Sequence, residues 1–183
     1  LSIASELDID TQGANTTQLI KRLQQRLVDI HAEGRQVVAL IDEAHAMPAG
    51  TLEQIRLLSN LETGKEKLLQ IVLMGQPELK TILSREELRQ LRQRILVHYE
   101  LRPLTRGDVS HYIQHRLTLA GSMGRPRFTP WAIRAIHRRS KGIPRIVNNL
   151  CDKSLLAAFI RESDEVTYWD ARRAAKDLDR LTD

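Results

Sequence analysis

Residues 36–47 carry the sequence Gln-Val-Val-Ala-Leu-Ile-Asp-Glu-Ala-His-Ala-Met, in which five consecutive apolar residues end in two adjacent carboxylates, Asp42 and Glu43. A short apolar run of this kind is typical of a strand buried on both faces, as in a parallel sheet. Ligands of open α/β sheets bind at the carboxyl ends of such strands. Of two acids placed there, one can hold Mg²⁺ and the next can orient or deprotonate a water. The stretch therefore indicates a nucleoside triphosphatase; the simpler alternative is a strand that ends in an ordinary polar loop.

The rest of residues 1–103 alternates apolar runs with amphipathic stretches. We expect helical segments over residues 16–33, 49–60 and 78–94, the last of them rich in arginine, and strands over residues 36–42, 68–74 and 95–101. Strands that alternate with helices are typical of α/β domains with a parallel sheet. The predicted fold class of this part is therefore α/β.

After Pro103 the apolar period becomes purely helical. Four helices are expected, beginning at or near Thr105, Thr129, Pro144 and Thr167. Because no strand-like run interrupts them, the sequence predicts an all-helical subdomain over residues 104–183 that follows a core over residues 1–103.

Composition indicates an ordinary globular protein, since 42% of the residues are hydrophobic and 28% are charged. No apolar stretch approaches the roughly 20 residues needed to span a bilayer, and no basic segment of a signal peptide opens the chain. Cys151 is the only cysteine, so an internal disulfide is excluded and a buried structural thiol is expected. These features together predict a reducing, cytoplasmic location.

The formal net charge is +5, and much of the excess lies in two arginine-rich tracts, residues 85–94 and 125–145. Such tracts could contact the phosphates of a nucleic acid, a nucleotide or a membrane surface. For most of these arginines a solvated helix face is the better explanation.

Three segments carry a more specific resemblance: Leu-Leu-Gln-Ile-Val-Leu-Met-Gly-Gln-Pro-Glu-Leu (68–79), Leu-Arg-Gln-Leu-Arg-Gln-Arg-Ile (88–95) and Gly-Ile-Pro-Arg-Ile-Val-Asn-Asn-Leu-Cys-Asp (142–152). They resemble the AAA+ ATPases of the ExeA/GspA secretion type, a group that includes the MshM protein of mannose-sensitive haemagglutinin (MSHA) pilus biogenesis. The resemblance runs over nearly the whole chain. It implies a truncated AAA+ parallel-sheet core followed by a helical lid. Transposition-target ATPases share much of the same pattern.

The resemblance also implies roles for individual residues at the strand tips. Asp42 resembles the Walker B acid that holds Mg²⁺, and Glu43 resembles the catalytic base. Gln76 occupies the sensor-1 position, where a polar side chain can reach the γ-phosphate or the attacking water; the alternative is a turn residue before Pro77. His45 is not expected to bind a metal ion, because no second His or Cys stands at ligand spacing.

Two arginines are implied to contact the nucleotide. Arg94 resembles the arginine finger that reaches the nucleotide of a neighbouring subunit in a ring, although Arg92 and Arg89 compete for that role. Arg145, in Gly-Ile-Pro-Arg, resembles the sensor-2 arginine at the start of a lid helix. A surface salt bridge remains the alternative for the finger candidates.

The phosphate-binding loop of the family is missing, since no Gly-x-x-x-x-Gly-Lys-Ser/Thr occurs in the chain. We therefore expect a fragment of a longer protein, cut downstream of that loop and inactive by itself. In the family the strand order is 5-1-4-3-2, with the loop-bearing strand 1 in the centre. Strand 95–101, which corresponds to strand 5, would then lack its neighbour and either slide beside strand 68–74 or leave an edge for another chain to cover.

The implied activity is ATP hydrolysis coupled to the assembly of a type II secretion or type IV (MSHA-like) pilus machine, with ATP and Mg²⁺ bound. Its implied partners are further copies of the chain in a ring, and secretion or pilus proteins at the cytoplasmic face of the bacterial inner membrane. The alternative is a DNA-binding AAA+ regulator of the transposition or initiator type, with the 125–145 tract on backbone phosphates. A scaffold without hydrolysis would leave the five site residues unexplained.

Overall fold

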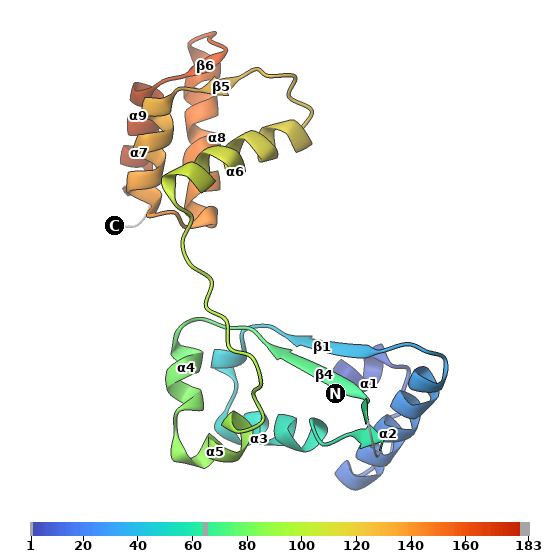
Figure 1. Ribbon diagram of the computed structural model, residues 1–183. Coiled ribbons are helices and arrows are strands. Elements are labelled where there is room, and N and C mark those ends of the chain that lie inside the picture. The colour runs from blue at the N-terminus through green and yellow to red at the C-terminus, as the bar shows by residue number, and fades with distance from the viewer. Residues whose placement is uncertain (1, 64–65, 180–183) are drawn as a thin grey trace. The chain divides into compact units, whose positions relative to one another are not determined.

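The computed structural model describes residues 2–63 and 66–179, and it divides into two compact units, Leu1–His98 and Tyr99–Asp183 (Figure 1). The sequence analysis placed the boundary at residues 103 and 104. Both positions fall in a segment, residues 95–105, that carries no helix or strand. Within residues 2–63 and 66–179, none of the helices combines the length and the apolar character that a membrane span requires.

The first unit is built around two parallel strands. In chain order its elements are α1 (Ser2–Glu6), α2 (Thr16–Ala32), β1 (Val37–Ile41), the 3₁₀ turn η1 (Ala44–Ala46), α3 (Ala49–Leu58), β2 (Glu62–Thr63), β3 (Glu66–Lys67), β4 (Leu69–Leu73), α4 (Glu78–Leu83), the 3₁₀ turn η2 (Glu86–Leu88) and α5 (Arg89–Arg92). The arginine-rich helical segment expected over 78–94 consists of two short helices and a 3₁₀ turn.

β1 and β4 pair in parallel, as the sequence predicted, and their register runs from Val37↔Leu69 to Ile41↔Leu73. Two further backbone bonds continue the pairing past the strand ends: Met74 N–H donates to Ile41 O, and Ala44 N–H donates to Met74 O, each at 2.8 Å. The carboxyl ends of both strands consequently lie at one edge of the sheet.

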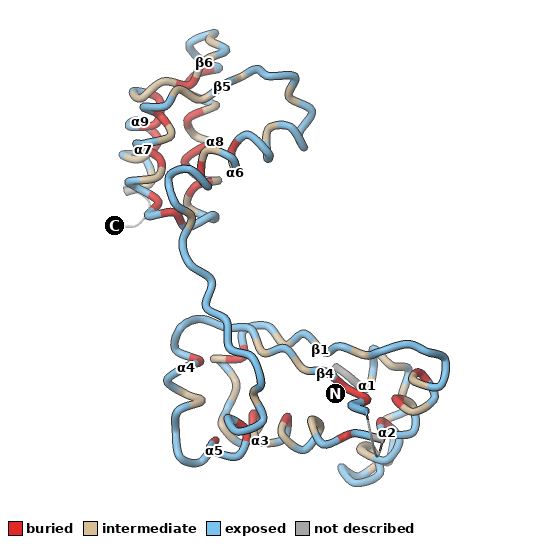
Figure 2. The backbone as a smooth tube through the Cα atoms, in the orientation of Figure 1, coloured by how far each residue is buried: buried red, intermediate tan, exposed pale blue. Residues whose placement is uncertain are grey.

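Only one face of this sheet is covered by helices of the described residues. On that face α2 packs Leu23 and Leu27 against Leu61, Leu68 and Leu69, while α3 and the η2–α5 segment bring Leu52, Ile55, Leu88 and Leu91 together. On the other face Val38, Leu40 and Val72 are exposed, with Leu40 at 67% (Figure 2). The prediction of a strand buried on both faces was therefore wrong for this chain. Its apolar residues do alternate between two faces, but helices of the described part cover one of them.

The third strand expected over residues 95–101 is not formed. Leu96, Val97, Tyr99 and Leu101 are each more than 80% exposed, and the segment pairs neither with β4 nor with any other described strand (Figure 2). A strand needs a neighbour for its N–H and C=O groups. β4 pairs only with β1 and keeps an open edge, yet the segment does not add to that edge, so β-type composition alone does not make residues 95–101 a strand.

The second unit is helical, in agreement with the prediction. Its elements are α6 (Arg106–Leu119), β5 (Arg127–Phe128), α7 (Pro130–Ser140), α8 (Pro144–Ile160), β6 (Glu165–Val166) and α9 (Tyr168–Asp179). The two-residue strands β5 and β6 pair in parallel and were not predicted, because two residues carry no period. Thr105 caps α6 reciprocally with Asp108, and Thr129 caps α7, which explains why these helices begin where the sequence indicated.

A continuous core joins the helices of the second unit. Its fully buried members include Val109, Ile136, Val147, Leu150 and Val166. Cys151 lies in the same core, and burial, with a smaller contribution from Asp152, raises the pKa of its thiol to about 12. This thiol is therefore an unreactive packing group at neutral pH.

Gly142 packs against the backbone of Leu104, near the start of the second unit. Its φ is +77°, and its carbonyl accepts the N–H of Leu104 at 2.9 Å. A Cβ on Gly142 would collide with the Leu104 carbonyl oxygen and lie 2.9 Å from the Leu104 nitrogen. Backbone cannot swing aside as a side chain can, so the position requires glycine for two separate reasons.

We predict that Gly142→Ala destabilises the second unit strongly. Gly121→Ala is the matched control, because Gly121 also has positive φ but meets no atom within 4 Å of an added Cβ. The free energy of unfolding of the control should fall by about 1 kcal/mol, from backbone strain alone. That of Gly142→Ala should fall by roughly 2 kcal/mol more, because of the collision. Denaturant unfolding followed by circular dichroism measures both, and equal losses would contradict the collision with Leu104.

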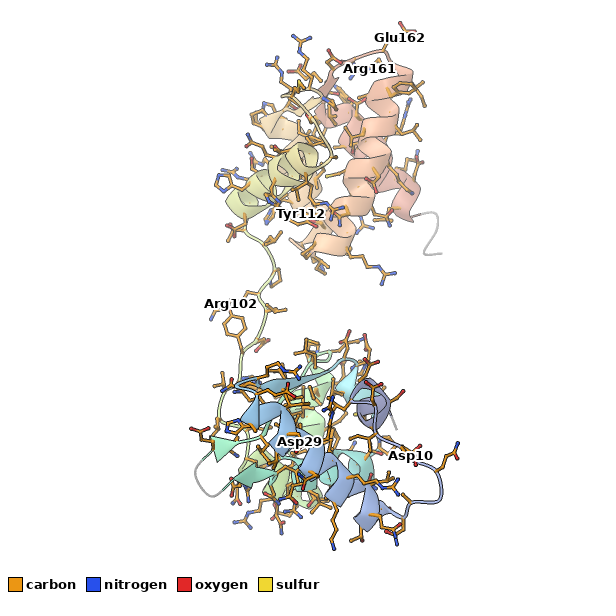
Figure 3. The ribbon with its side chains drawn as sticks, turned by 90° about the vertical axis from the view of Figure 1, so that its right-hand side faces the viewer. Asp10, Asp29, Arg102, Tyr112, Arg161 and Glu162 are labelled. Carbon is orange, nitrogen blue, oxygen red and sulfur yellow. The ribbon has the colours of Figure 1, made fainter. Side chains whose placement is uncertain are left out.

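Asp170 is a buried carboxylate that ties α9 to the end of α8. Arg161, at that end (Figure 3), donates to Asp170 Oδ2 at 2.8 Å, and the N–H and hydroxyl of Thr167 donate to the same oxygen at 2.8 Å each. Burial would raise the pKa of Asp170, but these hydrogen bonds and the Arg161 charge outweigh it, so the pKa lies below its ordinary value of 3.8.

A lowered folded-state pKa stabilises the fold above the unfolded-state value and loses that contribution as the pH falls through the folded-state value. Asp170→Asn should therefore cost roughly 1–3 kcal/mol at pH 7, and the gap to wild type should narrow below about pH 4. Unfolding free energies at pH 7, 5 and 3 check this. A gap that stays constant with pH would show that Asp170 contributes no charge-dependent stability.

Candidate functional site

The parallel pairing brings the polar residues after β1 and β4 to one edge of the sheet. Asp42 and Glu43 directly follow β1, Gln76 follows β4 after Met74 and Gly75, and all three side chains are exposed. His45, two residues after Glu43, joins the two tips because the N–H of Gln76 donates to His45 Nδ1 at 3.3 Å. The structure thus places Asp42, Glu43 and Gln76 at one edge of the sheet, where His45 contacts both Glu43 and Gln76.

Glu43 holds an unusual backbone conformation. Its φ is +52° and its ψ is +32°, the left-handed region, which costs a non-glycine residue of order 1 kcal/mol. The surroundings enforce it, since Glu43 N–H donates to Asp42 Oδ1 at 2.8 Å and the next residue, Ala44, is fully buried and bonded to Met74. Strain of this kind gathers at functional sites, and here it turns the chain sharply at the strand tip.

Asp42 supplies the kind of oxygen ligand that Mg²⁺ prefers, but the described residues around it do not enclose a metal ion. One carboxylate oxygen accepts the Glu43 N–H at 2.8 Å, and the residue as a whole is exposed. Among the described residues no cluster of three or more His, Cys, Asp or Glu side chains is placed to enclose a metal ion. Mg²⁺ usually binds through one or two carboxylates and keeps several waters, so a single acid on an exposed tip is compatible with it.

The three candidate arginine fingers differ in their contacts. Arg89 pairs with Glu86 at 3.2 Å, and Arg92 donates to the carbonyl of Ser84 at 2.8 Å. The exposed guanidinium of Arg94 has no hydrogen bond or ion pair within residues 2–63 and 66–179, and nothing in that part joins it to Asp42 or Glu43. Of the three, Arg94 is the side chain available to bind a group from outside the unit.

Arg145 is the second residue of α8 and belongs to the second unit. Its side chain is exposed, and Ile143 at the helix N-cap makes no side-chain hydrogen bond. The dipole of this helix end favours an anion nearby, although Pro144 has no N–H and the Ile146 N–H already donates to Ile143 O at 3.0 Å.

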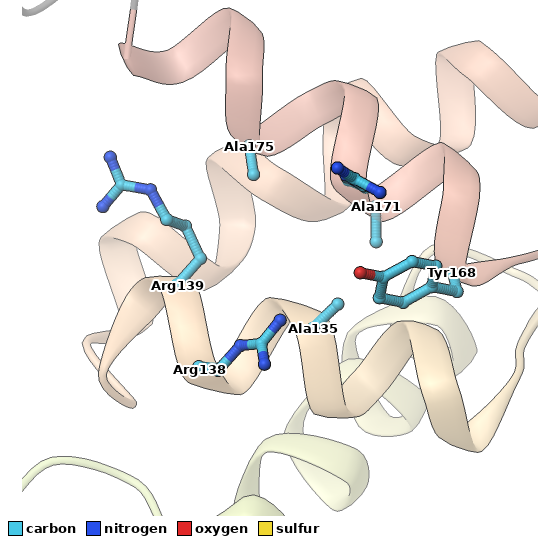
Figure 4. Close-up of a pocket in the computed structure, with 7 residues that line it drawn as sticks. Ala135, Arg138, Arg139, Tyr168, Ala171 and Ala175 are labelled. Carbon is cyan, nitrogen blue, oxygen red and sulfur yellow. The ribbon is translucent and has the colours of Figure 1, made fainter.

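An arginine-lined groove of about 170 Å³ lies within the second unit, and none of the site residues named above lines it. It runs between α7 and α9, with Ala135, Ala171 and Ala175 along the helix contact and Arg138, Arg139, Arg172 and Tyr168 around it (Figure 4). Small alanines let the two helices approach and leave the longer side chains to form the walls. The 125–145 tract is otherwise partly neutralised, because Arg125 pairs with Asp164 at 3.0 Å and Arg127 with Glu165 at 3.1 Å.

The link through His45 was missed from the sequence. His45 was weighed only as a metal ligand, whereas its contact depends on Gln76, 31 residues further along the chain. The strand pairing that creates the contact was predicted, but nothing in residues 36–47 indicates which way the imidazole turns.

Comparison with known proteins identifies relatives of both units. A family model described as an AAA domain matches residues 1–83. General secretion pathway protein A of Aeromonas hydrophila is 46% identical over 172 residues, which cover 94% of this chain and 31% of that protein. The chain therefore spans about a third of the curated relative that it matches.

Solved structures show the same fold at low identity. Cdc6p from Pyrobaculum aerophilum matches 96% of this chain and 48% of its own, with a TM-score of 0.70 and 14% identity. The Aeropyrum pernix ORC2 protein, solved in ADPNP–ADP complexes, matches 96% of this chain and 47% of its own, with a TM-score of 0.67 and 14% identity. A Thermotoga maritima RuvB mutant matches 95% of this chain and 55% of its own, with a TM-score of 0.61 and 20% identity.

Proposed function

The chain belongs to the AAA+ ATPase family and is related to general secretion pathway protein A, and on that basis we propose that it is part of an ATPase that drives the assembly of a secretion or pilus machine. The observation that carries the proposal is the 46% identity to that protein over 94% of the chain. The parallel strand tips supply a physical reason, because they place an acid pair and a polar side chain at one sheet edge. The machine is of the type II secretion or type IV (MSHA-like) pilus class.

In the proposed mechanism the strand-tip residues divide three tasks. Asp42 would hold Mg²⁺, which would supply positive charge beside the phosphates of ATP. Glu43 orients the attacking water and accepts its proton. Gln76, on the neighbouring tip, hydrogen-bonds the γ-phosphate or that water, so that both tips contact the reacting group.

The arginines supply positive charge from two further places. Arg94, which has no ion pair within the described part of the chain, reaches the nucleotide of a neighbouring copy in a ring. Arg145 contacts the phosphates from the lid and couples lid position to nucleotide state. Guanidinium suits both roles because its planar donors match phosphate oxygens.

The proposal requires a phosphate cradle from residues outside these 183. The chain contains no Gly-x-x-x-x-Gly-Lys-Ser/Thr loop, whose backbone N–H groups and lysine hold the β- and γ-phosphates. We propose that the loop lies elsewhere in the full-length protein, and that the assembled ring acts with secretion or pilus proteins at the cytoplasmic face of the inner membrane. Residues 1–183 alone are then inactive.

We predict that Glu43→Gln in the full-length protein retains ATP binding but lowers kcat by roughly 10²-fold or more, because only the group that activates water is lost. Glu162→Gln is the matched control, since Glu162 is exposed at the end of α8 (Figure 3) and should leave turnover unchanged. Steady-state phosphate release and nucleotide calorimetry measure both quantities.

Three outcomes of this experiment count against the proposal. Wild-type turnover in Glu43→Gln would remove Glu43 from its role. A full-length protein that hydrolyses no ATP would overturn the proposed function. Micromolar ATP binding by residues 1–183 alone would show that their phosphate site is built from other groups.

The arginine-lined groove supports a second candidate function, DNA binding. Arg138 and Arg172 line it without an acidic side chain among the lining residues, which is the charge pattern that backbone phosphates require. A DNA-binding regulator of the transposition or initiator type would use this groove, whereas a secretion ATPase would not need it.

We predict that, if this second function holds, the double variant Arg138→Ala/Arg172→Ala weakens duplex DNA binding by the full-length protein. The slope of log K against log salt should fall by about 1.8, which is about 0.9 per lost phosphate contact. Arg125→Ala/Arg127→Ala is the control, because these arginines already pair with Asp164 and Glu165. Absence of salt-dependent DNA binding in the wild type would exclude this function.

A further inference from the structure

One nitrogen atom of His45 is shared by two groups of the proposed ATPase site. His45 Nδ1 lies 3.3 Å from Glu43 Oε2, and it also lies 3.3 Å from the backbone nitrogen of Gln76. The first contact reaches the acid after β1, and the second reaches the tip of β4. A single atom therefore connects the two strand tips.

These two contacts require opposite states of that atom. To bond the Glu43 carboxylate, Nδ1 must carry a proton and donate it. To accept the Gln76 N–H, Nδ1 must be unprotonated and offer its lone pair. A neutral imidazole carries one proton, on either Nδ1 or Nε2, so the two bonds exclude each other at any instant. The ring holds Glu43 in one tautomer and the β4 tip in the other.

The imidazole is held in place from both sides. Its side chain is only 19% exposed, and the backbone before it is anchored by the Ala44 N–H bond to Met74 O. On the β4 side, a Cβ on Gly75 would lie 3.2 Å from both His45 N and His45 Nδ1. Absence of a side chain at Gly75 thus allows the ring to lie directly against the tip.

The 3.3 Å approach to His45 Nδ1 is the contact that can orient the Glu43 side chain. Its side chain is 64% exposed, and within the described residues its carboxylate makes no other hydrogen bond or ion pair. An exposed glutamate without partners samples many rotamers, whereas a base that activates water must hold one. A histidine that donates to the carboxylate restricts it in the way that outer partners orient catalytic and metal-binding groups.

We propose that His45 is a positioning residue that orients the Glu43 carboxylate through Nδ1–H and releases it when the β4 tip offers the Gln76 N–H to the same atom. The role rests on the ATPase function proposed above. The orientation of the Glu43 carboxylate then depends on the position of Gln76. The group that activates water is in this way coupled to the strand tip that contacts the γ-phosphate.

The kinetic test uses three substitutions of His45 in the full-length protein. His45→Ala should lower kcat by about 10–100-fold, as loss of an outer partner does, and leave KM for ATP unchanged. His45→Asn should recover most of the loss, because the asparagine amide places a polar atom near the position of Nδ1. His45→Gln should not, because its amide lies one carbon further out. His115→Ala is the control: His115 is exposed on α6, remote in sequence from either strand tip.

A spectroscopic test does not depend on catalysis. In full-length protein labelled with ¹⁵N in its histidine rings, the signal of His45 is assigned by its loss in His45→Asn. Glu43→Ala should shift the tautomer population toward the form with unprotonated Nδ1, because only the Gln76 N–H then remains as a partner.

The outcomes separate the two proposals. If the wild type hydrolyses no ATP, the proposed function fails, while ring shifts that are identical in wild type and Glu43→Ala would overturn the His45 contact independently. If the wild type is active and His45→Ala matches its kcat, the positioning role alone is wrong. Equal losses of kcat in the Ala, Asn and Gln variants, with matching losses of thermal stability, would show that His45 contributes packing and does not position Glu43.

Discussion

The parallel pairing of β1 with β4 is the constraint on which the candidate site depends. The register from Val37↔Leu69 to Ile41↔Leu73 places both carboxyl ends at one edge, and the bonds through Met74 extend the pairing into the turn that follows. That extension holds Ala44 in the interior and leaves Glu43 in the left-handed conformation. A slip of one residue would move Val37, Ala39 and Ile41 off the helix-covered face and carry the acid pair away from Gln76.

Two expected features of the first unit are not formed. Residues 95–101 have a strand-like composition, but they do not pair with the open edge of β4 and they stay largely exposed. The sheet face that carries Leu40 is open as well, because the described helices α2 and α3 cover the opposite face. Both departures concern partners that the apolar pattern of a single strand does not specify.

The sequence could predict those parts of the fold that depend on residues close together in the chain. Helix starts at Thr105 and Thr129 were recognisable because a capping side chain and the helix it caps lie within three residues of each other. The parallel strands were recognisable from composition and spacing. The conformation of Glu43 and the contact of His45 with Gln76 were not, since each depends on groups that only folding brings together. The roles of Asp42, Glu43, Gln76, Arg94 and Arg145 remain predictions.

Charge explains why such a site has to be assembled from several places. Asp42 and Glu43 are adjacent carboxylates on an exposed tip, and a triphosphate carries further negative charge. Like charges about 4 Å apart repel by roughly 1 kcal/mol in water and by about 4 kcal/mol near a protein surface. The acids can therefore act on a nucleotide only where cations surround it. Within the chain the exposed guanidiniums of Arg94 and Arg145 are available for this, one in each compact unit. The proposed set of groups therefore takes Arg94 from the unit that carries Asp42 and Glu43, and Arg145 from the other unit, so neither unit by itself supplies all of them.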